Sequence, residues 1–84
     1  MAKVYEARVE AADGGFGDYQ VEANGPHLVE GADSISEAIE LALSNEVELE
    51  PAPEIGGRIQ GQNGGEPYKF VDGDYITYYL FWQD

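Results

Sequence analysis

Carboxylates are the side chains best placed to do chemistry in this chain, and they are densest between residues 30 and 54. The stretch SNEVELEPAPE holds four glutamates within nine positions. Paired carboxylates can act as general acid and base, bind a hard cation, or attract a basic partner. Three of these glutamates alternate with other residues, and in an extended segment such side chains point the same way about 6.7 Å apart. The spacing predicts a row of like charges at Glu46, Glu48 and Glu50.

Catalysis is not favoured by the other reactive side chains. A nucleophilic mechanism needs an activated Ser, Cys or Lys beside a positioned base. The chain has no cysteine, its three serines fall in or beside an expected helix, and its one histidine, His27, follows a proline in an expected loop. Carboxylates are so abundant that any surface would bring two within catalytic distance. We expect a protein that is not an enzyme and has no catalytic residue.

A dedicated metal or phosphate site is not expected either. The stretch DGDYIT lacks the ligand spacing of an EF-hand loop, and Asp-Gly is a strong hairpin signal. The stretch GGRIQGQNGG lacks the Lys-Ser or Lys-Thr that completes a phosphate-binding loop. We expect no cofactor and no bound metal, with Mg²⁺ or Ca²⁺ associating only nonspecifically.

The charge balance defines the class of partner. Seventeen Asp and Glu against four Lys and Arg give a formal net charge of −13, beyond the magnitude of about 2–8 that keeps a small domain soluble. Binding to nucleic acid or to an anionic membrane needs basic side chains that are scarce here. The balance therefore predicts a basic protein partner, with no direct nucleic-acid binding and no membrane contact.

The chain is predicted to fold as one cytoplasmic domain, residues 1–84. Its 84 residues suffice for a single small core, and a hydrophobic content of 43% with ten aromatic residues argues against disorder. Without cysteine, neither a disulfide nor a thiolate zinc site can stabilise it. The first residues, MAKVYEARVEA, contain no continuous apolar stretch, and nowhere do eighteen apolar residues run together, so we expect neither a signal peptide nor a membrane span and predict a cytoplasmic location.

Alternation of polar and apolar residues predicts a first hairpin and then a helix. KVYEARVEA and DYQVEA read as half-buried strands joined at the turn DGG, with Tyr19, Val21 and Ala23 facing inward. A third extended segment brings Leu28 and Val29 to the core. A helix follows in SISEAIELALSN, where Ser34 and Glu37 have capping-box spacing. Its predicted apolar face is Ile35, Ala38, Ile39, Ala42 and Leu43, and Asn45 is expected to end it in a left-handed conformation.

The second half of the chain predicts an edge segment, a connector and a second hairpin. Two prolines after residue 50 favour an extended path or a sheet edge, and a Gly-rich connector surrounds Ile59. The final hairpin turns at Asp72-Gly73, and its second strand, YITYYLFWQ, is apolar on both faces and therefore central. Its aromatic residues favour a core, with a dimer or partner interface as the alternative, so we expect a monomer or weak dimer. The predicted fold is α+β: a small antiparallel sheet of four to five strands with one helix on one face.

The order of these elements resembles HicB-like domains, the antitoxin halves of certain toxin–antitoxin pairs. The resemblance covers about half the chain and is carried by turn and capping residues: Gly14-Gly15-Phe16, Gly25, Gly31, Asp33 and Glu37-Ala38. It implies a module that binds a small basic toxin. The chain departs from that family in lacking the usual Pro-rich segment before the helix and any DNA-binding extension, so DNA binding is not implied.

Acidity concentrated in one stretch suggests a different role. From residue 30 to residue 54 there are eight carboxylates and no basic side chain. Their spacing in an extended segment is comparable with two phosphate steps of roughly 3.4 Å along a DNA strand. The predicted partner-binding residues are Glu30, Asp33, Glu37, Glu40, Glu46, Glu48, Glu50 and Glu54.

A small, acidic, cysteine-free domain of this kind is similar to phage-encoded nucleic-acid mimics, several anti-CRISPR proteins among them. The likeness implies an inhibitor that acts in the host cytoplasm and blocks the DNA-binding groove of a CRISPR effector subunit. Salt adaptation is a further alternative, because halophilic proteins carry excess Asp and Glu, but their charges are spread over every face.

Overall fold

A computed structural model describes residues 3–12, 17–22, 24–60 and 64–84. Strand and helix bounds within these residues are β1 (Val4–Ala11), β2 (Tyr19–Val21), β3 (His27–Leu28), α1 (Ile35–Ser44), β4 (Glu50–Pro51), η1 (Pro53–Ile55, a 3₁₀ helix), β5 (Ile59–Gln60), β6 (Glu66–Asp72) and β7 (Tyr75–Gln83). The first predicted turn, DGG, and Ala23 lie outside the described residues, as does part of the Gly-rich connector.

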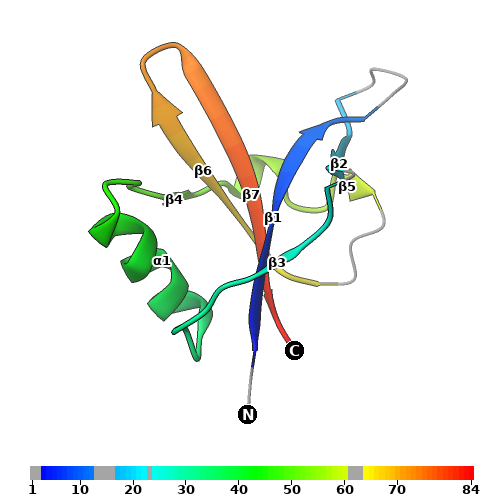
Figure 1. Ribbon diagram of the computed structural model, residues 1–84. Helices are drawn as coiled ribbons and strands as arrows, with labels where there is room; N and C mark the ends of the chain where they lie inside the picture. Colours follow the sequence, from blue (N-terminus) through cyan, green and yellow to red (C-terminus); the bar gives the residue numbers. More distant parts are fainter. Residues whose placement is uncertain (1–2, 13–16, 23, 61–63) are drawn as a thin grey trace.

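β7 is the central strand, as its two apolar faces predict. It pairs antiparallel with β1 on one side and with β6 on the other (Figure 1). The full order is β4-β6-β7-β1-β2-β5, and β3 pairs with β1 beside β2. Every pairing is antiparallel except that of β2 with β5. The α+β class and the mostly antiparallel sheet are confirmed.

The predicted strand number of four to five is wrong, because the described residues form a sheet of seven strands. β4 and β5 are two residues each, too short to show a period of two in the sequence. They arise because the chain pairs with β6 at residue 50, crosses one face of the sheet, and pairs with β2 at residue 59. Ile59, the apolar position within the predicted Gly-rich connector, is buried there.

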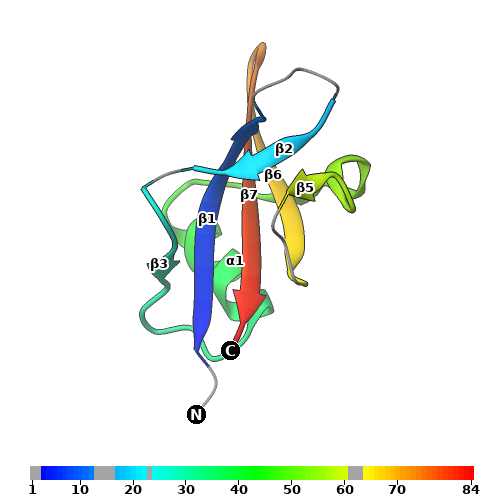
Figure 2. The same ribbon diagram turned by 90° about the vertical axis from the view of Figure 1, so that its right-hand side faces the viewer.

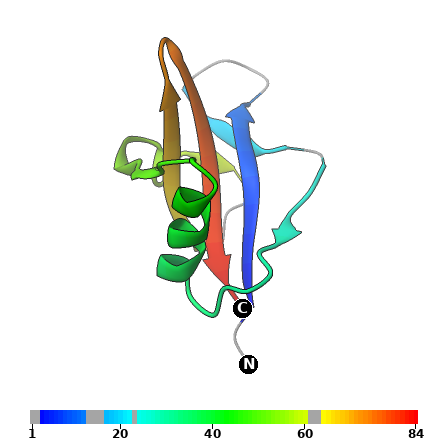
Figure 3. The same cartoon turned by 60° about the vertical axis from the view of Figure 1, so that its left-hand side comes forward.

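Both faces of the sheet are covered, each by a different segment. On one face the crossing segment places Ala52, Ile55 and Ile59 against Val9 and Leu80. On the other face α1 and the turn before it place Ala38 and Ala32 against Val4 and Phe81. Figures 1 and 3 show α1 lying over β6 and β7, and Figure 2 shows β5 and η1 on the side away from it. β1 therefore has buried side chains on both faces of the sheet, Val9 on one and Val4 on the other.

The aromatic rings of β7 pack mostly inside the molecule. Three of their centroids lie 5.5–5.9 Å from rings of other strands, in the pairs Tyr78 with Tyr19, Phe81 with Tyr68, and Trp82 with Tyr5. Removal from water is the main reason why the pKa of Tyr78 is raised above its ordinary value. The core interpretation is confirmed for these rings, whereas Tyr75 at the start of β7 is 80% exposed.

α1 begins as predicted but presents a shorter apolar face. The N–H of Glu37 donates to Ser34 Oγ (3.2 Å), and Glu37 Oε2 accepts from the N–H of Asp33 (3.3 Å). Ala38 is buried, and Ile35 and Ile39 pack beside it. Leu43, predicted inward, is 58% exposed. That prediction is wrong: in the second half of α1 it is Leu41 and Ala42 that line the space between the helix and the sheet, and Leu43 belongs to neither apolar cluster.

The end of α1 also differs from the prediction. Val47 N–H donates to Ala42 O and Glu46 N–H donates to Leu43 O, both at 2.9 Å, which is the hydrogen-bond pattern of a Schellman turn. Glu46 therefore holds the left-handed position, with φ of 66°. Asn45, predicted to hold it, has φ of −98°. Its side-chain amide instead donates to Leu41 O at 3.1 Å.

The two predicted hairpins form, with small shifts. Tyr19 and Val21 face the core beside Val9, as expected. The second hairpin turns through Gly73 and Asp74, one residue later than predicted, because Asp72 still pairs with Tyr75. Of the pair expected to reach the core before α1, Val29 packs there. The prediction for Leu28 is wrong: it is 47% exposed, because β3 lies beside β1 at the periphery of the sheet.

Replacing Ile55 by alanine tests whether the crossing segment is part of the core. Ile55 is almost completely buried against the sheet, so truncation should lower the free energy of unfolding by about 2–5 kcal/mol. Leu43→Ala is the control, because an exposed apolar side chain should change stability by no more than about 0.5 kcal/mol. Urea denaturation measures both. Equal effects of the two substitutions would show that the segment does not pack as described.

Candidate partner-binding surface

The eight predicted partner-binding residues are all exposed, but they do not form one patch. Glu30 and Asp33 precede α1, Glu37 and Glu40 lie on its solvent side, and Glu54 lies in η1. The remaining three follow α1 directly: Glu46, Glu48 and Glu50. The structure therefore divides the set by element, and residues 46–50, here called the acidic segment, form its densest part.

The acidic segment alternates as predicted, with exposed glutamates on either side of half-buried Val47 and Leu49. It starts where the carbonyl end of α1 carries a partial negative charge. The last turn of α1 contains no basic residue. The carboxylates and the helix dipole therefore add to one another, and negative potential is concentrated at this end of α1.

A cavity of about 250 Å³ joins the acidic segment to β6. Glu46, Glu48 and Glu50 line one wall, and Phe70 and Val71 of β6 line the other. We call this cavity the acidic groove. Its apolar wall was not predicted, because residues 20 positions apart become neighbours only through the pairing of β4 with β6. The groove offers carboxylates for a cation and an apolar surface for the aliphatic part of a basic side chain.

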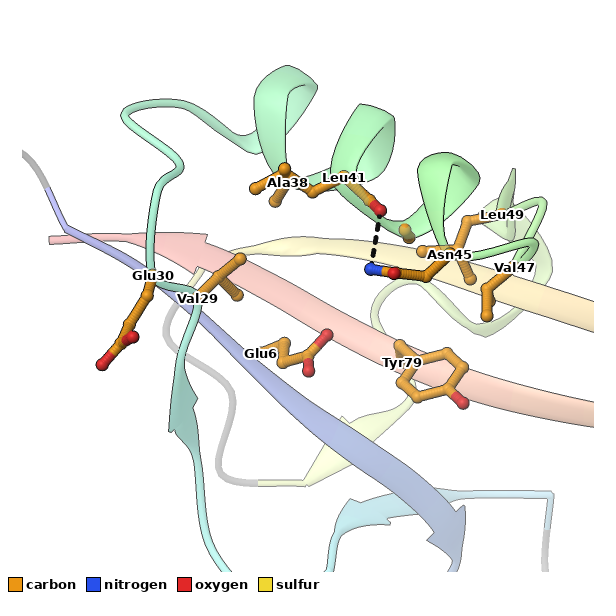
Figure 4. A pocket seen from close by; sticks show the side chains of 10 residues that line it. Glu6, Val29, Glu30, Ala38, Leu41, Asn45, Val47, Leu49 and Tyr79 are labelled. Carbon is orange, nitrogen blue, oxygen red and sulfur yellow. Dashed lines mark hydrogen bonds between the residues drawn. The ribbon is translucent and has the colours of Figure 1, made fainter.

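A second cavity, of about 350 Å³, lies between α1 and the sheet (Figure 4). Its lining includes Val29, Leu41 and Leu49, and the ring of Tyr79. Figure 4 shows the Glu6 side chain lying between Val29 and Tyr79. Glu6 was not predicted as a partner-binding residue, because the sequence indicates only that it lies on the polar face of a strand.

Glu54 differs from the other predicted residues in having an ionic partner. Its Oε2 accepts a hydrogen bond from Lys69 Nζ at 2.9 Å. Register places Lys69 beside Tyr78, on the face that η1 covers. Glu54 therefore lies across the sheet from α1, with its charge matched inside the molecule.

The other ion pair among the described residues joins Arg8 to Glu22 at 3.8 Å, so neither pair uses the acidic segment. Lys69 does lie near enough to Glu50 for its pKa to be raised by that charge as well as, chiefly, by Glu54. Glu46 and Glu48 take no part in an ion pair in the described part of the chain. Within the acidic segment, these two carboxylates are open to an external cation.

Two findings bear on other classes of function. Among the described residues, no three His, Cys, Asp or Glu side chains are grouped so as to hold a metal ion. The described helices include none with the length and apolar character needed to cross a membrane.

Comparisons with protein-family models, with curated proteins and with solved structures found no match for this chain. The likeness to HicB-like domains and the likeness to nucleic-acid mimics both stay predictions. The comparisons therefore give no support to any particular function.

The ion pair between Glu54 and Lys69 should make the stability of the fold depend on pH. The hydrogen bond from Lys69 is the main cause that lowers the pKa of Glu54 below 4.5 and raises the pKa of Lys69 above 10.5. Stability from Glu54 is present above pH 4.5 and is lost as pH falls through its lowered pKa. Stability from Lys69 is present below pH 10.5 and is lost as pH rises through its raised pKa.

Substitution of Lys69 by methionine should therefore return the pKa of Glu54 toward 4.5, as followed by NMR titration of its side-chain carboxyl carbon. Arg8→Met is the matched control, because it removes a cation that is paired elsewhere. A Glu54 pKa that stays low without Lys69 would contradict the assigned cause.

Replacing Glu46 by glycine tests whether the backbone at residue 46 is strained. A residue other than glycine in the left-handed region costs about 1 kcal/mol, so Glu46→Gly should raise the free energy of unfolding by about that amount. Glu48→Gly removes the same charge at a position with no positive φ and should not gain this term. Urea denaturation of both variants supplies the comparison, and equal shifts would show that φ at residue 46 carries no strain.

Proposed function

We propose that this protein is an acidic binding protein that inhibits a nucleic-acid-binding protein by occupying its basic groove. The observation that carries the proposal is the acidic segment. Three exposed glutamates lie at the negative end of α1, with no basic residue in the last helical turn.

Three features of this place are unfavourable for folding. Like charges stand close together, carboxylates lie at the helix end that favours cations, and a glutamate holds a left-handed position that favours glycine. A segment that served only to end the helix would use glycine at residue 46 and a lysine or arginine nearby. Because strain of this kind collects at functional sites, its location here supports a role in binding.

The proposed mechanism is electrostatic competition. Lysine and arginine side chains that line a nucleic-acid groove can donate charge-assisted hydrogen bonds to carboxylates as they do to phosphates. The acidic segment and the exposed Glu37 and Glu40 of α1 would supply these acceptors. Attraction between opposite charges speeds encounter and weakens as salt shortens the Debye length, which is about 8 Å at physiological ionic strength. A bound inhibitor of this kind excludes the nucleic acid.

The DNA-binding groove of a CRISPR effector subunit is the target that we propose. The support is the likeness in size, charge and lack of cysteine described above. Direct contact would involve Glu46, Glu48 and Glu50, with Glu37 and Glu40 beside them. Glu54 is left out of this set because Lys69 already neutralises it.

The proposal predicts displacement of labelled DNA from one or more of a panel of purified CRISPR effector complexes. The variant Glu46→Lys, Glu48→Lys, Glu50→Lys should weaken displacement by about a hundredfold, because three surface ion pairs of about 1 kcal/mol each are lost. A variant with the same charge change elsewhere, Glu10→Lys, Asp18→Lys, Glu66→Lys, should keep most activity. Fluorescence anisotropy at rising salt provides the measurement.

The displacement experiment tests the proposed target and the assigned surface separately. No displacement from any complex would contradict the proposed target, and equal loss in both triple variants would contradict the assigned surface. Salt adaptation makes the opposite prediction, in which molar salt raises the stability of the isolated protein and neither variant differs in displacement.

A further inference from the structure

The hairpin of β6 and β7 extends beyond the strands that support it. β4 pairs with β6 no further than Lys69, and β1 pairs with β7 no further than Tyr78, and these two residues pair with each other. Beyond them lie three further residue pairs and a two-residue turn, in residues 70–77. We call these residues the arm, and Figure 1 shows it projecting away from β1 and from α1.

The arm is apolar where a solvent-exposed hairpin would be polar. Val71 and Ile76 pair across the two strands, so they share a face, and they are 45% and 49% exposed. Tyr75, on the opposite face, is more exposed still. An isolated two-stranded hairpin is only marginally stable in water. Apolar side chains grouped at such a position mark a surface that another molecule covers.

The arm and the acidic groove form one continuous surface. Val71 belongs to the arm and also lines the groove, opposite the three glutamates of the acidic segment. Asp72 precedes the turn at the tip of the arm, and Asp74 lies within it. The same surface therefore presents an apolar patch, an acidic groove and two further carboxylates.

Charge decides what covers this surface. A second copy of the chain would bring its own acidic segment and aspartates against the same groups, and each copy carries a net charge of −13. Repulsion therefore disfavours a dimer through the arm. A segment that carries lysine or arginine beside apolar side chains fits both parts, with its cation in the groove and its apolar side chains on Val71 and Ile76.

We propose that the arm and the acidic groove together dock a protein segment in which basic and apolar side chains alternate. The proposal rests on the proposed function for the basic character of the partner, and it goes further by giving the complex an apolar anchor. Apolar contacts of this kind supply most of the binding energy at protein interfaces, with charged groups around them. The contacts with Val71 and Ile76 would also persist at high salt, whereas binding through carboxylates alone would weaken.

Two labelled synthetic peptides of equal charge test the proposal, one with lysines alternating with valines and one with lysines alternating with serines. The protein should bind the lysine–valine peptide about tenfold tighter, since burial of even two methylene groups contributes that much. Val71→Ser with Ile76→Ser should remove the preference. Leu28→Ser is the control, because Leu28 is similarly exposed on β3 and should leave the preference intact.

The outcomes separate this inference from the proposed function. Equal affinity for the two peptides, binding of neither, or a preference that survives in the arm variant would overturn the docking surface, while displacement of DNA could still stand. Replacing the three glutamates of the acidic segment by glutamine should weaken binding of both peptides alike. Sedimentation should show a monomer, and a dimer lost in the arm variant would identify the arm as a contact between copies.

Discussion

The pairing of β7 with both β6 and β1 is the interaction on which the rest of the structure depends. Its nine residues hold the middle of the sheet, and its alternate side chains reach both apolar clusters: Leu80 beneath the crossing segment and Phe81 beneath α1. Toward its first residue, Tyr75, the same strand extends beyond Tyr78, which is the last residue of β7 that pairs with β1. One strand therefore builds the core and also carries the arm away from it.

Electrostatics act in opposite directions at the two ends of α1. The amino end of α1 is favourable, because Glu37 takes part in the cap and lies near the positive end of the helix dipole. The carboxyl end is unfavourable, because the left-handed Glu46 and two further glutamates meet the negative end. The core has to offset this repulsion. Because backbone strain tends to collect at functional sites, this unfavourable helix end is the observation from which the proposed binding role is inferred.

Long periodic elements could be predicted from the sequence, whereas contacts between distant segments could not. The alternation in β1, the capping pair before α1 and the two apolar faces of β7 each gave the correct element. β4 and β5 are too short to carry a period, and their pairing depends on where the chain crosses the sheet. Asn45 is the residue that the sequence predicts for the left-handed position, because asparagine is among the residues that favour it, yet Glu46 holds that position. The glutamates of the acidic segment were predicted individually, but their apolar partner across the groove, Val71, was not.

The central claim is that negative potential is concentrated at the carboxyl end of α1 and beside the arm. Relaxation of backbone amide protons by a cationic and by an anionic paramagnetic cosolute measures the near-surface potential residue by residue. The largest ratio of cationic to anionic relaxation should occur at residues 46–48 and 71–72, with smaller ratios near Arg8 and Lys69. A ratio that is uniform over all exposed amides would contradict the claim, because evenly spread charge would leave no distinct surface for a basic partner.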